Sequence, residues 1–143
     1  MAVSRYLQIP ANVESLRKLD AFITSAVGSY GAATAVRIQL AVHEVCLNII
    51  KHAYTGQDGE IELELVIDGA RLEIVVRDSA PPIFDLSSRP PPPNPFDLPE
   101  GGWGLHIVFS VMDRVEHRRM ANGNEWLLVK QLSRLDEHSA GVE

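Results

Sequence analysis

Apolar and charged residues alternate with a period of two between residues 60 and 78, and this is the clearest pattern in the chain. The apolar positions are Ile61, Leu63, Leu65 and Ile67 in a first run and Leu72, Ile74 and Val76 in a second. Such alternation is typical of half-buried strands, and Asp68-Gly69 between the runs is a hairpin signal. Each strand therefore has one dry and one wet face, so we expect helices to cover only one side of the sheet.

Asp78 ends the second of these strands and has the parity of its dry face. A buried polar group without a hydrogen bond costs roughly 1 to 3 kcal/mol, and a charged group costs more. We therefore expect Asp78 to accept hydrogen bonds, and a ligand amine is one candidate donor.

Two helices are predicted before these strands. The first covers residues 13–30, with Asn12 as its N-cap, and the second runs from a cap at Thr34 to about Tyr54. A short strand over residues 6–9 is predicted before both helices. It ends there because the next residue is a proline.

Residues 79–100 contain two proline runs, 81–82 and 90–93, which resist both helix and central strand. A loop of this length is uncommon in a compact domain unless it acts as a lid or a binding loop. A linker between two domains is the alternative, although too little chain follows it to build a second core comfortably.

The chain after this loop predicts one more helix and one more hairpin. Gly101-Gly102-Trp103-Gly104 leads into the helix, which is apolar on one side. Residues 115–119 and 125–132 then form two strands around Asn122-Gly123.

The length of 143 residues fits one domain over 1–143, with a core at about 5–132, a lid at 79–100 and a polar tail at 133–143. Apolar residues make up 45% and charged residues 22% of the chain, which is ordinary for a soluble globular protein. The net charge of -6 argues against direct nucleic-acid binding, which normally requires a basic surface.

Cys46 is the single cysteine of the chain, which excludes an internal disulfide and a cysteine-based zinc cluster. No stretch approaches the roughly 18 apolar residues that a spanning helix needs, and the N-terminus has no long apolar core. We therefore expect a cytoplasmic protein that makes no membrane contact.

Candidate chemistry lies on the second helix, where Glu44, Asn48 and Lys51 project from one face. An amide oxygen suits magnesium when phosphates and waters complete the octahedron, so Asn48 is a candidate metal ligand. Glu44, one turn earlier, is then placed to act as a general base. The alternative is a solvated helix face with an ordinary Glu-Lys pair.

The glycines between Gly101 and Gly104 let the backbone approach an anion, and the helix start behind them presents N–H groups, so a phosphate site is one interpretation. A plain turn is the other. His52 is placed either to contact phosphate or to cap the end of its helix. The histidines without metal-like spacing are His43, His106 and His117.

The run from Glu44 to Tyr54 has the pattern Glu-x-x-x-Asn-x-x-x-His-Ala-Tyr, which resembles the N box of the GHKL ATPases and especially of the RsbW/SpoIIAB-like anti-sigma factor serine kinases. Asp78 stands where this family has its adenine-binding aspartate, and Gly102-x-Gly104-Leu105 is similar to the second glycine box. The order and spacing of these motifs agree across roughly residues 5 to 132.

The resemblance implies an α/β (α+β) two-layer sandwich, the Bergerat fold, with a mixed, mostly antiparallel sheet covered on one face by three helices. It implies ATP and Mg2+ as cofactors, with Asn48 holding magnesium, Glu44 as catalytic base and Asp78 taking the adenine amino group. The further nucleotide-binding positions that it implies are Lys51, His52, Ala80, Gly102, Gly104 and Leu105.

Members of this family phosphorylate a serine on an anti-anti-sigma protein of the STAS fold and alternately bind a sigma factor, often as homodimers. The resemblance therefore implies a serine/threonine-protein kinase and anti-sigma factor that regulates transcription by partner switching.

One departure concerns the first glycine box, where the family has Asp-x-Gly and this chain has Asp78-Ser79-Ala80. Ala80 adds a methyl group where the backbone approaches the base. This favours a second hypothesis, a nucleotide-responsive binding module that sequesters its partner without phosphoryl transfer. A third hypothesis, the detached ATP-binding domain of a histidine kinase, predicts a phospho-accepting histidine in the first helix, and residues 13–30 contain no histidine.

Overall fold

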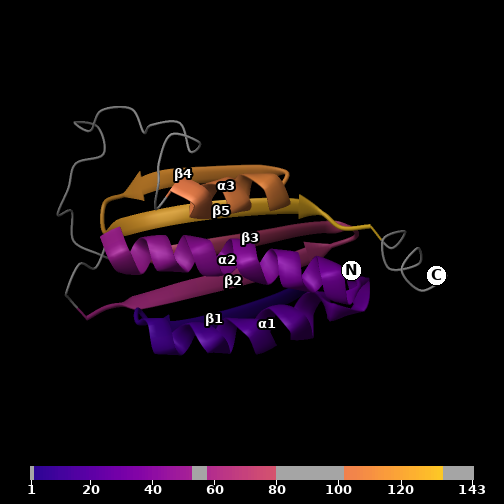
Figure 1. Cartoon of the computed structure of the whole chain (residues 1–143), viewed down its shortest axis with the longest axis horizontal. Helices are drawn as coiled ribbons and strands as arrows, with labels where there is room; N and C mark the ends of the chain where they lie inside the picture. Colours follow the sequence, from indigo (N-terminus) through magenta and orange to yellow (C-terminus); the bar gives the residue numbers. More distant parts are fainter. Residues whose placement is uncertain (1, 53–57, 80–101, 134–143) are drawn as a thin grey trace.

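The computed structural model describes residues 2–52, 58–79 and 102–133, which form two layers (Figure 1). One layer is a five-stranded sheet in the order β1-β2-β3-β5-β4. Its strands are β1 (Ala2–Pro10), β2 (Glu60–Asp68), β3 (Arg71–Asp78), β4 (Arg114–Met120) and β5 (Gly123–Gln131). The other layer is made by α1 (Arg17–Val27), α2 (Ala32–His52) and α3 (Gly102–Val111), with the short 3-10 turns η1 (Val13–Leu16) and η2 (Gly28–Tyr30) flanking α1.

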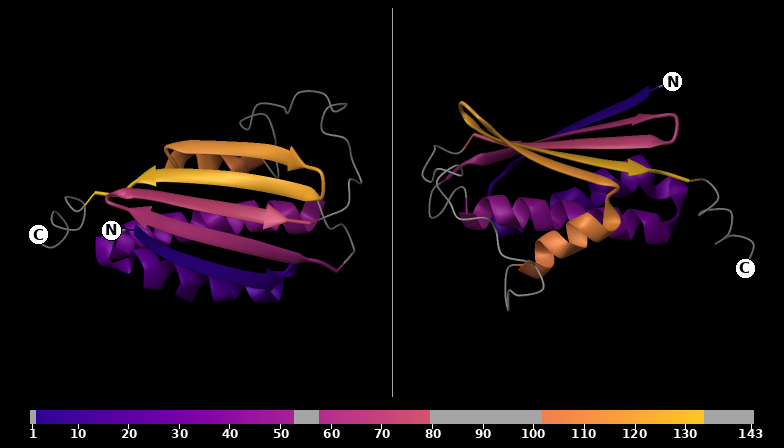
Figure 2. Two further views of the ribbon diagram at one scale, coloured as in Figure 1. Left: turned by 180° about the vertical axis from the view of Figure 1, so that it is seen from behind. Right: turned by 90° about the horizontal axis from the view of Figure 1, so that it is seen from above.

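All three helices lie on one face of the sheet, which the views from behind and from above show most clearly (Figure 2). The predicted two-layer α+β architecture is thereby confirmed. The prediction of a mixed sheet is wrong, because every pairing between the described strands is antiparallel. β4 does run parallel to β3, but β5 lies between them, so the parallel strands never share hydrogen bonds.

The hairpin of β2 and β3 has the register that the alternating pattern predicts. Ile61 pairs with Asp78 at one end, and Asp68 pairs with Arg71 beside the turn. The apolar positions of both strands are buried, whereas the positions between them are half-buried or exposed. The sheet therefore buries one face beneath the helices, as predicted.

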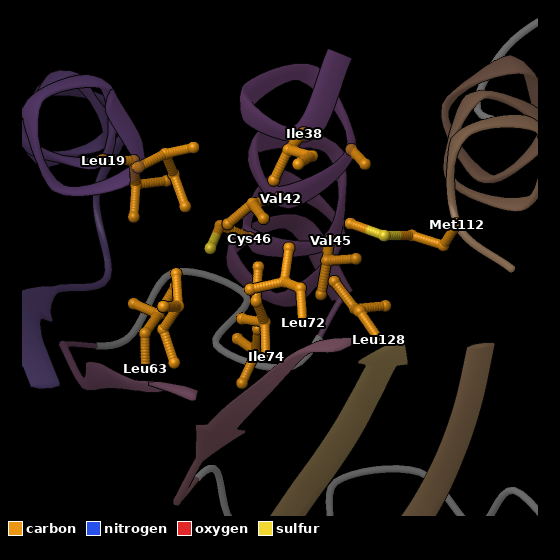
Figure 3. Close-up of a cluster of buried hydrophobic side chains, with 14 of the residues drawn as sticks. Leu19, Ile38, Val42, Val45, Cys46, Leu63, Leu72, Ile74, Met112 and Leu128 are labelled. Carbon is orange, nitrogen blue, oxygen red and sulfur yellow. The ribbon is translucent and has the colours of Figure 1, made fainter. Parts of the chain in front are cut away.

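The core lies between the two layers, where side chains of all three helices meet those of the central strands (Figure 3). The fully or nearly fully buried residues shown there include Leu19, Val42 and Val45 from α1 and α2, Met112 directly after α3, and Leu63, Leu72, Ile74 and Leu128 from the strands. Full burial of one such side chain contributes about 1.5 to 3 kcal/mol, so this layer contact supplies most of the stability.

The helix starts show one confirmed cap and one correction. The Oδ1 atom of Asn12 accepts a hydrogen bond from the backbone N–H of Ser15 over 2.9 Å, as a cap should, although a 3-10 turn separates this cap from α1. Thr34 is not the cap of α2, since it is buried inside the helix. Gly31 takes that place: its φ is 113°, and its carbonyl accepts from the N–H of Ala35 over 3.1 Å.

Three further boundaries differ from the predictions. β1 is longer than the predicted strand 6–9 because it pairs with β2 along its whole length, from Ala2 to Pro10. α3 already begins at Gly102, so Gly102 and Gly104 belong to the helix and not to a loop before it. The second hairpin turns through Ala121 and Asn122, because Gly123 pairs with Met120 and belongs to β5.

α2 is the most apolar long helix that the structure describes. Its segment Ala32–Lys51 is long enough, with a mean hydropathy of 1.3, to pass as a membrane-spanning helix by length and composition. α2 has this composition because it is the central helix: the sheet covers one side of it, and α1 and α3 cover its flanks (Figure 1). A core helix passes the same test as a spanning helix, so the expected absence of a spanning helix stays a prediction.

Candidate functional site

The predicted site residues come from elements that end together. The C-terminal end of α2, the C-terminal end of β3, the start of α3 and the turn between β4 and β5 all lie at one end of the molecule (Figures 1 and 2). Helix ends and strand ends expose backbone groups and polar side chains, which makes this end suited to ligand binding.

Asp78 lies in a row of inward-facing residues that crosses the sheet at this end. Its neighbours in the row are Ile61 on β2 and Asn124 on β5, and Arg119 on β4 follows. Asp78 is 7% exposed, in agreement with the parity of its strand. Its Oδ1 atom accepts from the backbone N–H of Asn124 over 3.3 Å and from the Asn124 side-chain amide over 3.2 Å. The buried carboxylate therefore accepts hydrogen bonds from Asn124, whereas the sequence suggested a ligand amine as one candidate donor.

Gly123 lets β5 approach Asp78 closely. A Cβ atom placed on Gly123 would lie 1.8 Å from the carbonyl oxygen of Asp78 and 2.9 Å from the Cα atom of Ser79. Its φ of 140° is also one that residues with a side chain rarely adopt. Only glycine fits there without a shift of backbone, so Gly123 sets the distance between β5 and the end of β3.

Glu44 and Asn48 lie on the flank of α2 that faces α3. The opposite flank faces α1 and carries His43, whose Nε2 atom lies 2.9 Å from Oδ1 of Asp20 on α1. Successive helical residues turn by about 100°, so Asn48, five residues after His43, faces away from α1, and Glu44 precedes Asn48 by one turn. Both side chains are half-buried. Figure 3 shows Val45, between them in sequence, beside Met112, which directly follows α3.

The remaining predicted residues are placed only in part. Lys51 is exposed near the end of α2, and Leu105 is half-buried and packs against the core. His52, Gly102 and Gly104 are described as helical backbone alone. Ala80 and the predicted lid up to residue 100 lie outside the described residues.

A hollow of about 700 Å³ opens at the same end of the sheet. Its lining includes Asp78 and Asn124 but also Gln8, Glu62 and Arg77, which belong to the outer face. Glu44, Asn48 and Lys51 of α2 do not line it. This hollow lies largely on the outer side of the sheet, so the candidate site is formed by the side chains on the helical side.

The donor set on α2 fits one kind of metal binding. Among the residues that the structure describes, no group of three or more His, Cys, Asp or Glu side chains is placed to hold a metal ion. The amide of Asn48 is a single hard ligand, and a magnesium ion needs six. The residues that the structure describes therefore suit a magnesium ion whose other ligands would be phosphate oxygens and water, and they form no complete metal cage of their own.

Two residues of the β4–β5 hairpin were missed as site residues. Asn124 has the inward parity of β5 at its very start, so the argument that singled out Asp78 applies equally to it. His117 was set aside for lack of metal-like spacing, yet its Nε2 atom lies 3.1 Å from Oδ1 of Asn124. The parity of β5 was a usable signal for Asn124, whereas nothing in the sequence shows that β5 lies beside β3.

Comparison with known proteins agrees with the geometry. The profile of the histidine kinase-like ATPase domain matches residues 9–130. The serine-protein kinase RsbW of Listeria monocytogenes is 33% identical over 120 residues, which cover 77% of this chain and 76% of the relative.

Two solved structures share the fold. The RsbU and RsbW domains of a Mycobacterium tuberculosis protein give a TM-score of 0.67 at 17% identity, over 92% of this chain and 32% of that one. The histidine kinase domain of a blue-light activated kinase from Erythrobacter litoralis gives a TM-score of 0.53 at 21% identity, over 92% of this chain and 65% of that one. This chain thus spans about a third of the first solved chain.

The resemblance carried by the motifs is confirmed, because both the profile and the RsbW relative cover most of the sequence. This chain belongs to the histidine kinase-like ATPase domain family.

Proposed function

We propose that this protein is an ATP-dependent serine/threonine-protein kinase and anti-sigma factor. In this proposal it phosphorylates a STAS-domain anti-anti-sigma protein and alternately binds a sigma factor. The observation that carries it is the buried Asp78 at the end of β3, on the helical side of the sheet and at the same end of the molecule as Asn48. The serine-protein kinases named RsbW, similar over three quarters of the chain, support the reaction class.

Each residue has a role that follows from its place. The Asp78 carboxylate accepts from the amino group of adenine, because a carboxylate held inward can only accept hydrogen bonds. The Asn48 amide oxygen ligates magnesium, and Glu44, one turn earlier, takes the proton from the attacking serine hydroxyl. Magnesium-bound ATP supplies the transferable phosphoryl group, and the protein contributes mainly positioning and charge.

The phosphates belong at the start of α3. Its first backbone N–H groups have no acceptor within the helix and carry partial positive charge, which suits an anion. Gly102 and Gly104 open this helix without bulky side chains, so a phosphate can approach the backbone. Lys51, His52 and Leu105 complete the proposed nucleotide contacts.

Partner switching, the homodimer and the cytoplasmic location belong to the same proposal. They follow the family pattern, and the net charge of -6 fits protein partners better than nucleic acid.

A second candidate function is a nucleotide-responsive module that sequesters its partner without transferring phosphate. The observation that favours it is Ala80, which replaces the glycine of the first glycine box. Loss of that glycine stiffens the chain next to the base.

A transfer experiment separates the two functions. The protein is incubated with labelled ATP, magnesium and STAS-domain proteins encoded nearby, and label on the STAS protein is counted for wild type, Glu44→Ala and the surface control Glu14→Ala. We expect label with wild type and Glu14→Ala, and a loss of about 100- to 10,000-fold with Glu44→Ala while ATP still binds. ATP binding without any transfer by wild type would instead select the sequestering module.

A further inference from the structure

A chain of hydrogen bonds connects the edge strand β4 to Asp78. His117 Nε2 lies 3.1 Å from Asn124 Oδ1, and Asn124 Nδ2 donates to Asp78 Oδ1 over 3.2 Å. The three residues belong to the adjacent strands β4, β5 and β3, and all have inward parity. Asn124 and Asp78 are 5% and 7% exposed, whereas His117 reaches the solvent. We name this chain the His117 relay.

The chemistry of these groups fixes the direction of each hydrogen bond. An ionised carboxylate only accepts, so the NH2 end of the Asn124 amide must face Asp78. The carbonyl end then faces His117, which must donate from Nε2. Both the imidazolium and the neutral tautomer protonated at Nε2 can do so. His117 therefore locks the Asn124 amide in the single orientation that serves Asp78.

Packing fixes His117 in turn. Its ring centroid lies 4.6 Å from that of Trp126, with the ring planes tilted by 45°. Trp126 is 8% exposed and pairs directly with His117 across the two strands. The imidazole thus packs against a buried ring of the core, and the relay runs from this contact to the carboxylate.

We propose that His117 and Asn124 are positioning residues that aim the Asp78 carboxylate at the exocyclic amino group of a purine base. The inference rests on the proposed binding of adenine by Asp78. Two Asn124 donors reach Oδ1 of Asp78: the backbone N–H, which the strand holds, and the side-chain amide, which the relay orients. Together they orient the carboxylate. The specificity of the site for a 6-aminopurine therefore depends on a histidine that does not touch the nucleotide.

The test compares two nucleotides that differ by one group. Dissociation constants are measured by calorimetry, with magnesium, for ATP and for purine riboside triphosphate, which lacks the 6-amino group. The variants are His117→Phe, which keeps a ring against Trp126 but cannot donate, and His117→Gln, which can donate through its amide. His43→Phe applies the same substitution to a histidine that contacts Asp20 on α1.

For wild type and His43→Phe we expect tighter binding of ATP than of the analogue. His117→Phe should weaken the binding of ATP about 2- to 10-fold, which corresponds to one net hydrogen bond. It should leave the affinity for the analogue unchanged. His117→Gln should restore most of the preference. Asn124→Ala, which removes the middle of the relay, should match or exceed His117→Phe.

The remaining outcomes distinguish a failure of the relay from a failure of the contact between Asp78 and adenine. If wild type prefers ATP and His117→Phe keeps the full preference, the relay has no positioning role, while the proposed function stands. Equal weakening of both nucleotides by His117→Phe would show a merely structural role and overturn the inference as well. If wild type itself shows no preference for ATP, the proposed contact between Asp78 and adenine is overturned, and the inference that rests on it is overturned as well.

Discussion

Gly123 offers the sharpest test of how the site end of the sheet is built. Alanine at this position would place its Cβ atom 1.8 Å from the Asp78 carbonyl oxygen, and real Cβ atoms keep at least 3.0 Å from such neighbours. The start of β5 must therefore move away from the end of β3. That movement strains or breaks both hydrogen bonds from Asn124 to Asp78.

The expected cost combines two effects. An unfavourable φ costs about 1 to 3 kcal/mol, and each lost hydrogen bond costs about 1 kcal/mol, so Gly123→Ala should lower the free energy of unfolding by about 3 to 5 kcal/mol. Gly69→Ala is the matched control, because Gly69 also has a positive φ, 65°, but nothing lies within 4 Å of the added Cβ. Its cost should be about 1 to 2 kcal/mol, from the left-handed conformation alone.

Urea denaturation of both variants, followed by circular dichroism, measures this difference. A typical domain has about 5 to 15 kcal/mol of stability, so both variants should fold well enough to be compared. Equal destabilisation by Gly123→Ala and Gly69→Ala would refute the close approach of β5 to Asp78.

Three further predictions concern stability. Ile74→Ala should cost about 2 to 5 kcal/mol in urea denaturation, because Ile74 is fully buried in the core, and a loss under 1 kcal/mol would contradict the packing. Burial raises the pKa of the Cys46 thiol from 9.0 to about 12, so the folded state keeps its proton longer than the unfolded state. The stability advantage of wild type over Cys46→Ala should therefore shrink as pH rises above about 9 toward 12, and a constant advantage would contradict it. Hydrogen bonds from Arg77 and Arg118 lower the pKa of Glu125. Their contribution to the free energy of unfolding is therefore present above the ordinary pKa of 4.5 and is lost as pH falls. The free energy of unfolding should thus fall less steeply with decreasing pH in Arg77→Ala than in wild type. An equal slope for the two proteins would refute the pairing.

Local patterns predicted much of the fold. The alternation in β2 and β3 gave both strands, the turn at Gly69 and the inward side of Asp78, because a period of two is imposed by the backbone itself. Asn12 was recognisable as a cap because capping involves only neighbouring residues. Thr34 misled for the same reason: its side chain is a good cap, yet the φ of Gly31 had already turned the chain into the helix.

The contacts around Asp78 were harder to predict because they join distant segments. Asn124 lies 46 residues after Asp78, and their hydrogen bonds exist only because β5 inserts between β3 and β4. The need for glycine at position 123 arises from the same insertion. His117 was set aside for lack of metal-like spacing, and its sequence position could not reveal contacts that depend on Asn124 and on the packing of Trp126.

The central claim is that Asp78 binds the base of a nucleotide at the end of β3. Calorimetric titration of wild type and Asp78→Asn with ATP and magnesium tests it most directly. Asparagine can still accept from Asn124 through its oxygen, so circular dichroism should show an intact fold. A hydrogen bond to a charged group contributes about 1.5 to 3 kcal/mol, so Asp78→Asn should weaken ATP binding at least about 10-fold. Equal affinity of the two proteins for ATP would contradict the claim.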